Sequence, residues 1–453
     1  MNHVIGFKCS LCGAEYALDQ LDYVCPHHGD EGNLDIVYDY ARLKRAFSRA
    51  ELAARRDPSI WRYLPLLPIQ AEALASLSGD STHPLMHVGG MPLYAPGRLR
   101  QAAGLPHLYL KDDSRNPSAS FKDRASAVAI VKAVELGREV VCAASTGNAA
   151  SSLACLSAGI GLRNIIFVPE TAPEAKIAQL LIFGATVLAV KGNYDAAFEL
   201  SIAASKEFGW YCRNTGYNPY TVEGKKTVAF EICEQLDWRA PDWICVPVGD
   251  GNIIAGVHKG LQNLLALGWI ERMPRLMGVQ SELSAACANA WQAGTATVAP
   301  VQASTIADSI SVDLPRDGVR AVRAVNETGG TYVTVSDEAI LQAIPTLGRL
   351  AGVFAEPAGA TAYAGLLQAL AQGSVSPGET IVVLVTGNGL KDVRSAIRVA
   401  GEPLRIEPAL DEVKRVLGNS RNQVFAKHFP ALRLGMQGKK LGFCGKINTR
   451  RTL

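Results

Sequence analysis

Long hydrophobic runs are missing from this sequence of 453 residues. The longest apolar stretches, such as TIVVLV at 380–385, have the length of a strand. A membrane-spanning helix needs about 20 consecutive apolar residues. Residues 1–8 also lack the apolar core of a secretory signal. These absences argue against a membrane protein and against a secreted one, so we expect a cytoplasmic protein.

A disulfide framework is also absent from the pattern of cysteines. Ten cysteines are scattered along the chain. Six of them fall in runs that we expect to form core strands or helices (Cys142, Cys155, Cys212, Cys233, Cys245 and Cys287). Buried and dispersed cysteines are typical of reduced thiols in a cytosolic protein.

Acidic residues are missing from the end of the chain. Residues 418–453 contain eight Lys and Arg but no Asp or Glu, whereas the whole chain has a net charge of only +3. The remainder is therefore mildly acidic. A basic end can contact nucleic acid, but no binding motif accompanies this one. We expect a loosely ordered basic tail, with neither a nucleic acid nor a membrane as partner.

The composition is that of an α/β enzyme, with 48% hydrophobic and 19% charged residues. The length allows two or three domains. Predicted strands alternate with helical patterns, and several strands are apolar on both faces, which indicates a parallel sheet covered by helices. The predicted strands are 107–111, 139–145, 164–169, 186–191, 243–249, 275–280, 331–336 and 380–386.

Lys122 lies in the stretch NPSASFKDRAS at 116–126, between a turn and the start of a predicted helix. The Asn-Pro pair indicates a turn, Ser118 and Ser120 are favourable helix caps, and residues 121–135 have the apolar spacing of a helix. The positive end of the helix dipole disfavours an ammonium group in the first turn. This position suits a neutral, nucleophilic amine, as in a Schiff base.

Three glycine-containing loops follow predicted strands, where ligands of open α/β sheets bind. STGNAAS at 145–151 offers backbone N–H groups and one amide, Asn148. GDGNIIAGVHKG at 249–260 forms a second cradle, which is fit for a phosphate. GNGLKD at 387–392 follows the hydroxyl of Thr386. Together with the lysine, these loops supply the amine, phosphate cradle, amide and neutral hydroxyl that pyridoxal phosphate needs.

The sequence resembles the threonine synthases, which are fold type II (β-family) pyridoxal-phosphate enzymes. Five motifs carry the resemblance: NPSASFKDR, STGN, YTVEGKKTVAFEICEQL (220–236), PVGDGN and TGNGLKD. The resemblance implies roles for ten residues. Lys122 would form the Schiff base, Asn148 would bond the cofactor's 3′ oxygen, and Thr386 would face the pyridine nitrogen. Backbone N–H groups of Gly249, Asp250, Gly251 and Asn252 would hold the phosphate, and Ser145, Thr146 and Gly147 would hold the substrate α-carboxylate.

The fold implied by the resemblance consists of two open α/β domains with mostly parallel twisted sheets and the cofactor in the cleft between them. We expect a large cofactor-binding domain from residues 41–129 and 226–417, and a small α/β domain from 130–225. A zinc-ribbon-like extension would occupy residues 1–40. The family also suggests a homodimer that acts on a small amino acid.

The extension has the spacing of a zinc site. Cys9-x2-Cys12 and Cys25-x2-His28 are separated by twelve residues, and glycines follow both pairs. Three thiolates and one imidazole would saturate a tetrahedral structural zinc. His27 is a competing ligand, and a redox CxxC or a metal-free vestige is the alternative.

Four positions depart from the family pattern. Thr221 stands where an arginine usually follows the NPY element, Ala149 follows STGN, and Met91 and Asn388 replace a threonine and a histidine. A divergent threonine synthase would need another cation for the substrate phosphate, and Lys225, Lys226 and Arg124 are candidates. The alternatives are β-replacement on O-phosphoserine as in cysteate synthase, a serine or threonine dehydratase, and a non-catalytic regulatory relative.

Overall fold

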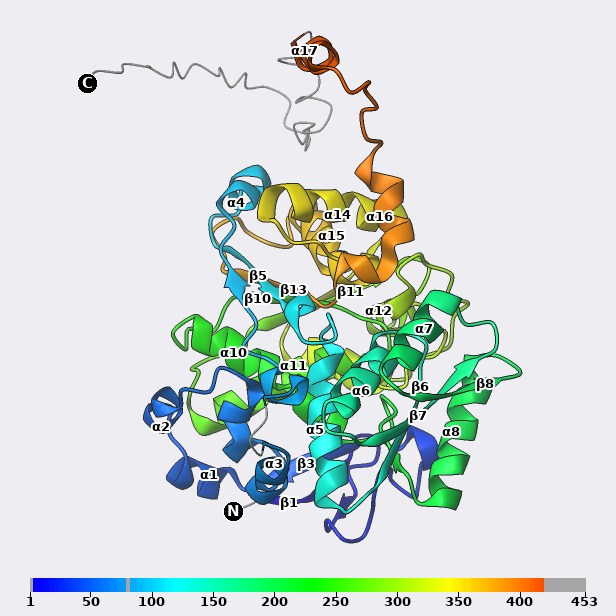
Figure 1. The fold of residues 1–453 in the computed structure, drawn as a ribbon. Coiled ribbons are helices and arrows are strands. Elements are labelled where there is room, and N and C mark those ends of the chain that lie inside the picture. Colours follow the sequence, from blue (N-terminus) through cyan, green and yellow to red (C-terminus); the bar gives the residue numbers. More distant parts are fainter. Residues whose placement is uncertain (1–2, 79–81, 419–453) are drawn as a thin grey trace, which may run out of the picture. The chain divides into compact units, whose positions relative to one another are not determined.

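A computed structural model describes residues 3–78 and 82–418 (Figure 1). Backbone contacts divide the chain into two compact units, one ending at Gly401 and one beginning at Glu402. Residues 402–410, at the start of the second unit, are exposed. In the second unit the structure describes one helix, α17 (Leu410–Gly418). Most of the predicted basic tail, 419–453, lies outside the described residues.

The first unit opens with a small antiparallel sheet. Strand β1 (Val4–Cys9) lies between β2 (Glu15–Tyr16) and β3 (Leu34–Tyr38). Side chains of β3 alternate between buried and partly buried, as expected for a strand with one face on a core. The sheet packs into the main core through Phe7, Leu34 and Ile36.

A six-stranded sheet has the order β12-β11-β10-β13-β5-β4. All neighbouring strands are parallel except β4, which pairs antiparallel with β5. Alternate residues of β13 enter two different core clusters, Val382 and Leu384 on one face and Ile381, Val383 and Val385 on the other. The strands are β4 (Leu93–Tyr94), β5 (Leu108–Asp112), β10 (Trp243–Pro247), β11 (Arg275–Ser281), β12 (Thr331–Val335) and β13 (Ile381–Val385).

A separate four-stranded parallel sheet has the order β8-β7-β6-β9. Helix α8 packs on β6 and β7 through one core cluster, and α6 contacts the same strands. The strands are β6 (Val140–Ala144), β7 (Arg163–Pro169), β8 (Thr186–Val190) and β9 (Tyr211–Cys212).

Helices cover both faces of the large sheet (Figure 1). Helix α15 contacts β10 to β13 and packs against α14, whereas α11 and α13 contact β10, β11 and β12 as part of the other core cluster. The helices of the first unit are α1 (Tyr40–Ala46), α2 (Arg49–Ala54), α3 (Ala71–Ser78), α4 (Gly97–Ala103), α5 (Lys122–Glu135), α6 (Asn148–Ala158), α7 (Glu174–Ile182), α8 (Tyr194–Phe208), α9 (Tyr220–Lys225), α10 (Thr227–Gln235), α11 (Asn252–Leu267), α12 (Ala286–Gln292), α13 (Gly318–Glu327), α14 (Asp337–Ala351), α15 (Pro357–Ala371) and α16 (Val393–Ala400).

All eight predicted strands are present, and their pairing is parallel as predicted. The two-residue strands β4 and β9 were not predicted, because runs of that length carry no periodicity. The domain boundaries at 129 and 225 stay a prediction. Among residues 3–78 and 82–418, no helix combines the length and the apolar character needed to cross a membrane.

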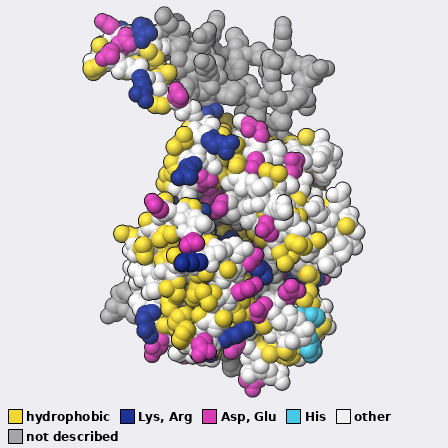
Figure 2. Space-filling model, turned by 90° about the vertical axis from the view of Figure 1, so that its right-hand side faces the viewer, with side chains coloured by type: hydrophobic (Ala, Val, Ile, Leu, Met, Phe, Trp, Pro, Cys, Tyr) yellow, Lys and Arg dark blue, Asp and Glu magenta, His cyan; other side chains and the backbone are white. Residues whose placement is uncertain are grey.

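One face of the molecule is shown in space-filling form in Figure 2. Basic and acidic side chains are interspersed on this face among broad hydrophobic areas. Leu181 and Ile182 of α7 are among the exposed large hydrophobic residues of the described chain.

Candidate active site

A cavity of about 400 Å³ is lined by residues at the carboxyl ends of β6, β10 and β13 and by the first residues of α5, α6 and α11. The structure brings together in its wall all ten residues that the sequence suggested for cofactor and substrate: Lys122, Ser145, Thr146, Gly147, Asn148, Gly249, Asp250, Gly251, Asn252 and Thr386. These residues lie beyond strand ends of the four-stranded and the six-stranded sheet, so the cavity lies between those two sheets.

Lys122 is the first residue of α5, as the sequence predicted. Its side chain is half-buried, and its amine has no hydrogen-bond partner within the described part of the chain. Burial lowers the pKa of Lys122 and Arg213 lowers it further, whereas Asp250 and Glu356 act in the opposite direction. The pKa of this amine is therefore lower than that of an exposed lysine, which favours a nucleophilic role.

The loop before Lys122 is held differently from the predicted serine cap. Phe121 precedes α5 without a side-chain cap, and the buried hydroxyl of Ser120 has no partner in residues 3–78 and 82–418. Instead the backbone N–H of Ser118 donates to Asp123 (2.6 Å). Ala119 adopts a left-handed φ of 62°, which only a tightly constrained non-glycine residue tolerates.

The loop between β10 and α11 forms a cradle in which glycine is required. Gly251 has a φ of 87°, and an added Cβ would lie 2.7 Å from the carbonyl oxygen of Asp317. A Cβ on Gly249 would lie 2.8 Å from the Cα of Ile310. The loop leads directly into the first turn of α11, whose N–H groups have no helical acceptors. Free N–H groups at the positive end of a helix are a binding site for a phosphate.

A buried carboxylate that the sequence did not reveal, Glu356, lies beside Asn148. Asn148 donates from Nδ2 to Oε1 of Glu356 (2.7 Å) and to the hydroxyl of Ser309 (3.4 Å). Burial raises the pKa of Glu356, while Lys391, Asn148 and Lys122 act against that rise. In the sequence Glu356 precedes a proline at a helix start, so it resembled an ordinary helix-end residue.

Thr386 lies at the end of β13 and connects that strand to the Lys122 loop. Its carbonyl oxygen accepts from the N–H of Phe121 (2.8 Å), and its side chain is buried in the cavity wall. A neutral hydroxyl can bond a pyridine nitrogen without protonating it fully.

Three further cations line the same cavity: Arg213, Lys225 and Arg316. Arg213 donates to Ser126 (3.1 Å) and Thr215 (2.9 Å), but its buried Nη2 has no partner among the described residues. Lys225 donates to the side-chain oxygen of Asn252. Burial lowers the pKa of Lys225 and of Arg213, to about 10 for Arg213, which therefore stays charged at neutral pH. The sequence suggested Lys225 and missed Arg213.

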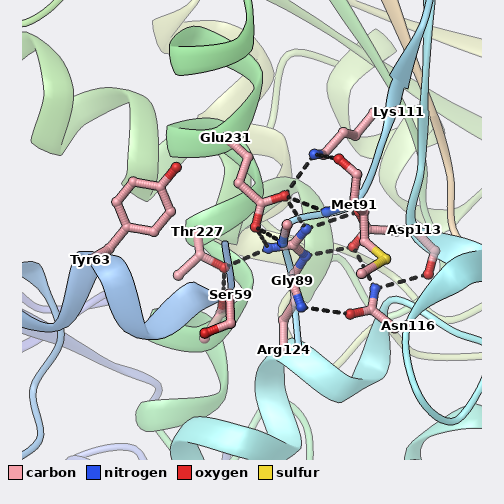
Figure 3. A network of polar contacts seen from close by, with 12 residues as sticks. Ser59, Tyr63, Gly89, Met91, Lys111, Asp113, Asn116, Arg124, Thr227 and Glu231 are labelled. Carbon is pink, nitrogen blue, oxygen red and sulfur yellow. Dashed lines mark hydrogen bonds and ion pairs between the residues drawn. The ribbon is translucent and has the colours of Figure 1, made fainter. Parts of the chain in front are cut away.

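The other two proposed phosphate donors, Arg124 and Lys226, do not line the cavity. Arg124 is enclosed between Asp113 and Glu231, and Lys111 also pairs with Glu231 (Figure 3). Lys226 forms a buried ion pair with Glu223 and a hydrogen bond to the Tyr38 hydroxyl. Both expectations are corrected: these side chains are engaged in the core.

Of the four departures from the family pattern, only Ala149 lies in the cavity wall. Thr221 is fully buried and bonds the carbonyl oxygen of Asn218 (2.8 Å). Met91 lies in the network of Figure 3, where its backbone bonds Lys111 and Glu231. Asn388 caps the turn before α16. Three of the departures therefore do not line the cavity.

The four predicted zinc ligands converge in the extension. Ligand atoms of Cys9, Cys12, Cys25 and His28 all lie within 4.8 Å of one another. The Sγ atoms of Cys12 and Cys25 are 3.9 Å apart. The competing His27 has Nδ1 3.9 Å from Sγ of Cys12. Three sulfurs and one imidazole nitrogen this close together fit a tetrahedral zinc ion.

Comparison with known proteins identifies the family to which the chain is similar. The family model described as "Pyridoxal-phosphate dependent enzyme" matches residues 84–387. The threonine synthase of Methanocaldococcus jannaschii is 38% identical over 413 residues, which cover 90% of this chain and 98% of that protein. The threonine synthase of Methanosarcina acetivorans is 36% identical over 412 residues, with the same coverage.

Solved structures with lower identity share the fold. A threonine deaminase isoform of Solanum lycopersicum matches with a TM-score of 0.60 at 23% identity, covering 68% of this chain and 82% of that one. Maize serine racemase matches with a TM-score of 0.60 at 22% identity, covering 72% and 95%.

Proposed function

Because the chain belongs to the threonine synthase family of pyridoxal-phosphate dependent enzymes, we propose that it converts O-phosphohomoserine and water into threonine and phosphate. The observation that carries the proposal is a cavity in which the amine of Lys122, a glycine cradle and the unpartnered Nη2 of Arg213 occur together. These groups suit a cofactor and a substrate that both carry phosphate.

We assign each part of the cavity wall one role. Lys122 is the amine that binds the cofactor and moves protons at Cα and Cβ of the substrate, because its pKa is lowered by burial. The cradle at 249–252 holds the cofactor phosphate, and Asn148 and Thr386 orient the ring. The bound cofactor supplies an electron sink for elimination and replacement. The uncapped first turn of α6, with Ser145, Thr146 and Gly147, holds the substrate carboxylate.

We assign the substrate phosphate to Arg213. Its Nη2 is buried and has no partner in the part of the chain that the structure describes, whereas the other cavity arginine, Arg316, already forms an ion pair with Asp195 (2.7 Å). A charged donor that lacks an acceptor gains most from a dianion. Lys225 contacts Asn252 at the cradle, so we assign it to the cofactor phosphate.

A steady-state comparison tests this function. The wild-type protein should form threonine and phosphate in equal amounts from O-phosphohomoserine, and much less product from O-phosphoserine. Arg213→Met should raise KM for O-phosphohomoserine by about tenfold or more, since a charge-assisted bond is worth roughly 1.5–3 kcal/mol. Arg316→Met is the matched control and should raise KM much less. Turnover of O-phosphoserine at a higher kcat/KM would overturn the substrate assignment.

We further propose that Cys9, Cys12, Cys25 and His28 bind one structural zinc ion. Support comes from their convergence and from the saturated donor set, which leaves no position for a substrate. A cytoplasmic location is supported by the nine described cysteines, all of which are free. The homodimer stays a prediction, which sedimentation of the purified protein would decide.

A further inference from the structure

A series of polar contacts connects the N-terminal sheet with the start of α11. Asp35 on β3 accepts from Nη1 of Arg320 on α13 (2.9 Å). Arg320 also donates to both carboxylate oxygens of Asp317, from Nε (2.5 Å) and from Nη2 (2.9 Å). Asp317 in turn accepts from Nδ2 of Asn252 (2.7 Å). Asn252 is the first residue of α11, so this series of contacts ends at the phosphate cradle.

The residues in the middle of this series hold one another in position. The side chains of Asp317, Arg320 and Asn252 are at most 4% exposed. A buried charge that loses its partner is strongly destabilised, so each group holds the next in place. Asp317 is also tied to the cradle by its backbone, because its N–H donates to the carbonyl oxygen of Asp250 (2.9 Å). The packing of Gly251 against Asp317 leaves no room for a side chain between them.

The last contact of the series involves a residue of the cavity wall. Asn252 donates to Asp317 through its amide nitrogen, so its amide oxygen must face the other way. There it accepts from the ammonium nitrogen of Lys225, which lines the cavity. The orientation of Asn252 therefore fixes where Lys225 presents its amine.

We propose that Asp35 and Arg320 are positioning residues for the cofactor phosphate, so that the N-terminal sheet takes part in cofactor binding. They touch neither cofactor nor substrate. They act by holding Asp317 and Asn252, which fix the cradle and Lys225. This inference rests on the proposed function, because it takes the cradle to be the cofactor-phosphate site.

The experiment separates phosphate binding from general stability by comparing two ligands. Dissociation constants of pyridoxal phosphate and of pyridoxal, which lacks the phosphate, are measured by absorbance titration of the full chain. Asp35 is the best position to change, because it is partly exposed and Asp35→Asn keeps its shape. The matched control is Glu15→Gln, which removes an exposed ion pair with Lys8 in the same sheet.

Asp35→Asn removes the carboxylate charge that Arg320 and Arg323 share. It should weaken binding of pyridoxal phosphate by about tenfold, since the charge-assisted contact to Arg320 is lost, and should leave binding of pyridoxal unchanged. Hydrogen exchange of residues 249–254 should become faster in the same variant without any ligand. Glu15→Gln should change none of these values. Arg320→Lys keeps the charge but loses the bidentate contact with Asp317. It should therefore weaken binding of pyridoxal phosphate without weakening binding of pyridoxal.

Two results would overturn the inference. One is an unchanged preference for pyridoxal phosphate in both Asp35→Asn and Arg320→Lys. The other is an equal loss for both ligands, since that indicates general destabilisation. A wild-type protein that binds the two ligands equally would instead contradict the proposed cofactor site itself.

Discussion

Removal of the negative charge at the centre of the network in Figure 3 should strongly destabilise the fold. Glu231 accepts from Arg124 (2.6 and 2.8 Å) and from Lys111 (2.6 Å), as well as from the backbone N–H groups of Gly90 and Met91. In Glu231→Gln these donors face a neutral amide that also carries its own N–H groups. Because a broken buried ion pair costs about 3–5 kcal/mol, we expect a loss of that size in the free energy of unfolding.

The pH dependence of this loss has a definite sign. Burial alone would raise the pKa of Glu231, but Arg124 and Lys111 outweigh it and hold that pKa at about 2. A carboxylate whose pKa is lowered by folding stabilises the protein above its unfolded value, and the contribution disappears as the pH falls through the folded value. The difference between wild type and Glu231→Gln should therefore be full at pH 7 and shrink as the pH falls from about 4.5 towards 2.

Urea unfolding of both proteins at several pH values measures the effect. Glu139→Gln serves as control, because Glu139 pairs with Arg163 on the surface, where such pairs contribute about 0–1 kcal/mol. If Glu231→Gln is no less stable at pH 7 than Glu139→Gln, the buried network does not hold this part of the fold together.

Three further predictions concern the cofactor and the metal. Gly251→Ala should greatly weaken binding of pyridoxal phosphate, since the added Cβ would strike Asp317; an unchanged dissociation constant would show that the phosphate binds elsewhere. Thr386→Asp should protonate the pyridine nitrogen and divert flux towards transamination, and unchanged product ratios would count against Thr386 as its partner. Metal analysis should give about one zinc per chain in the wild type and much less in Cys25→Ser; equal contents would remove the zinc assignment.

The cavity wall was predictable because its residues follow strands of clear pattern. Lys122, Asn148 and Thr386 each come within a few residues of a strand end or helix start, and parallel strands bring such positions to one edge. Their roles came from the family resemblance rather than from the pattern. Arg213 was missed because it follows β9, which has only two residues and no periodicity.

Side-chain direction was the part that the sequence could not supply. Lys225 and Lys226 are neighbours in the chain, but consecutive residues in helical conformation point about 100° apart. One therefore reaches the cavity and the other a core ion pair. The contact of Asp35 with Arg320 joins residues 285 positions apart, which no local pattern can reveal.

Lys122 is proposed as the lysine that holds the cofactor, and the cavity wall contains a second lysine, the fully buried Lys225, that could compete for this role. Borohydride reduction of the protein with pyridoxal phosphate, followed by peptide mass spectrometry, shows which lysine is covalently attached. We predict attachment at Lys122 in the wild type and in Lys225→Met, and no attachment in Lys122→Ala. Attachment at Lys225 in the wild type, or full labelling of Lys122→Ala, would contradict the account.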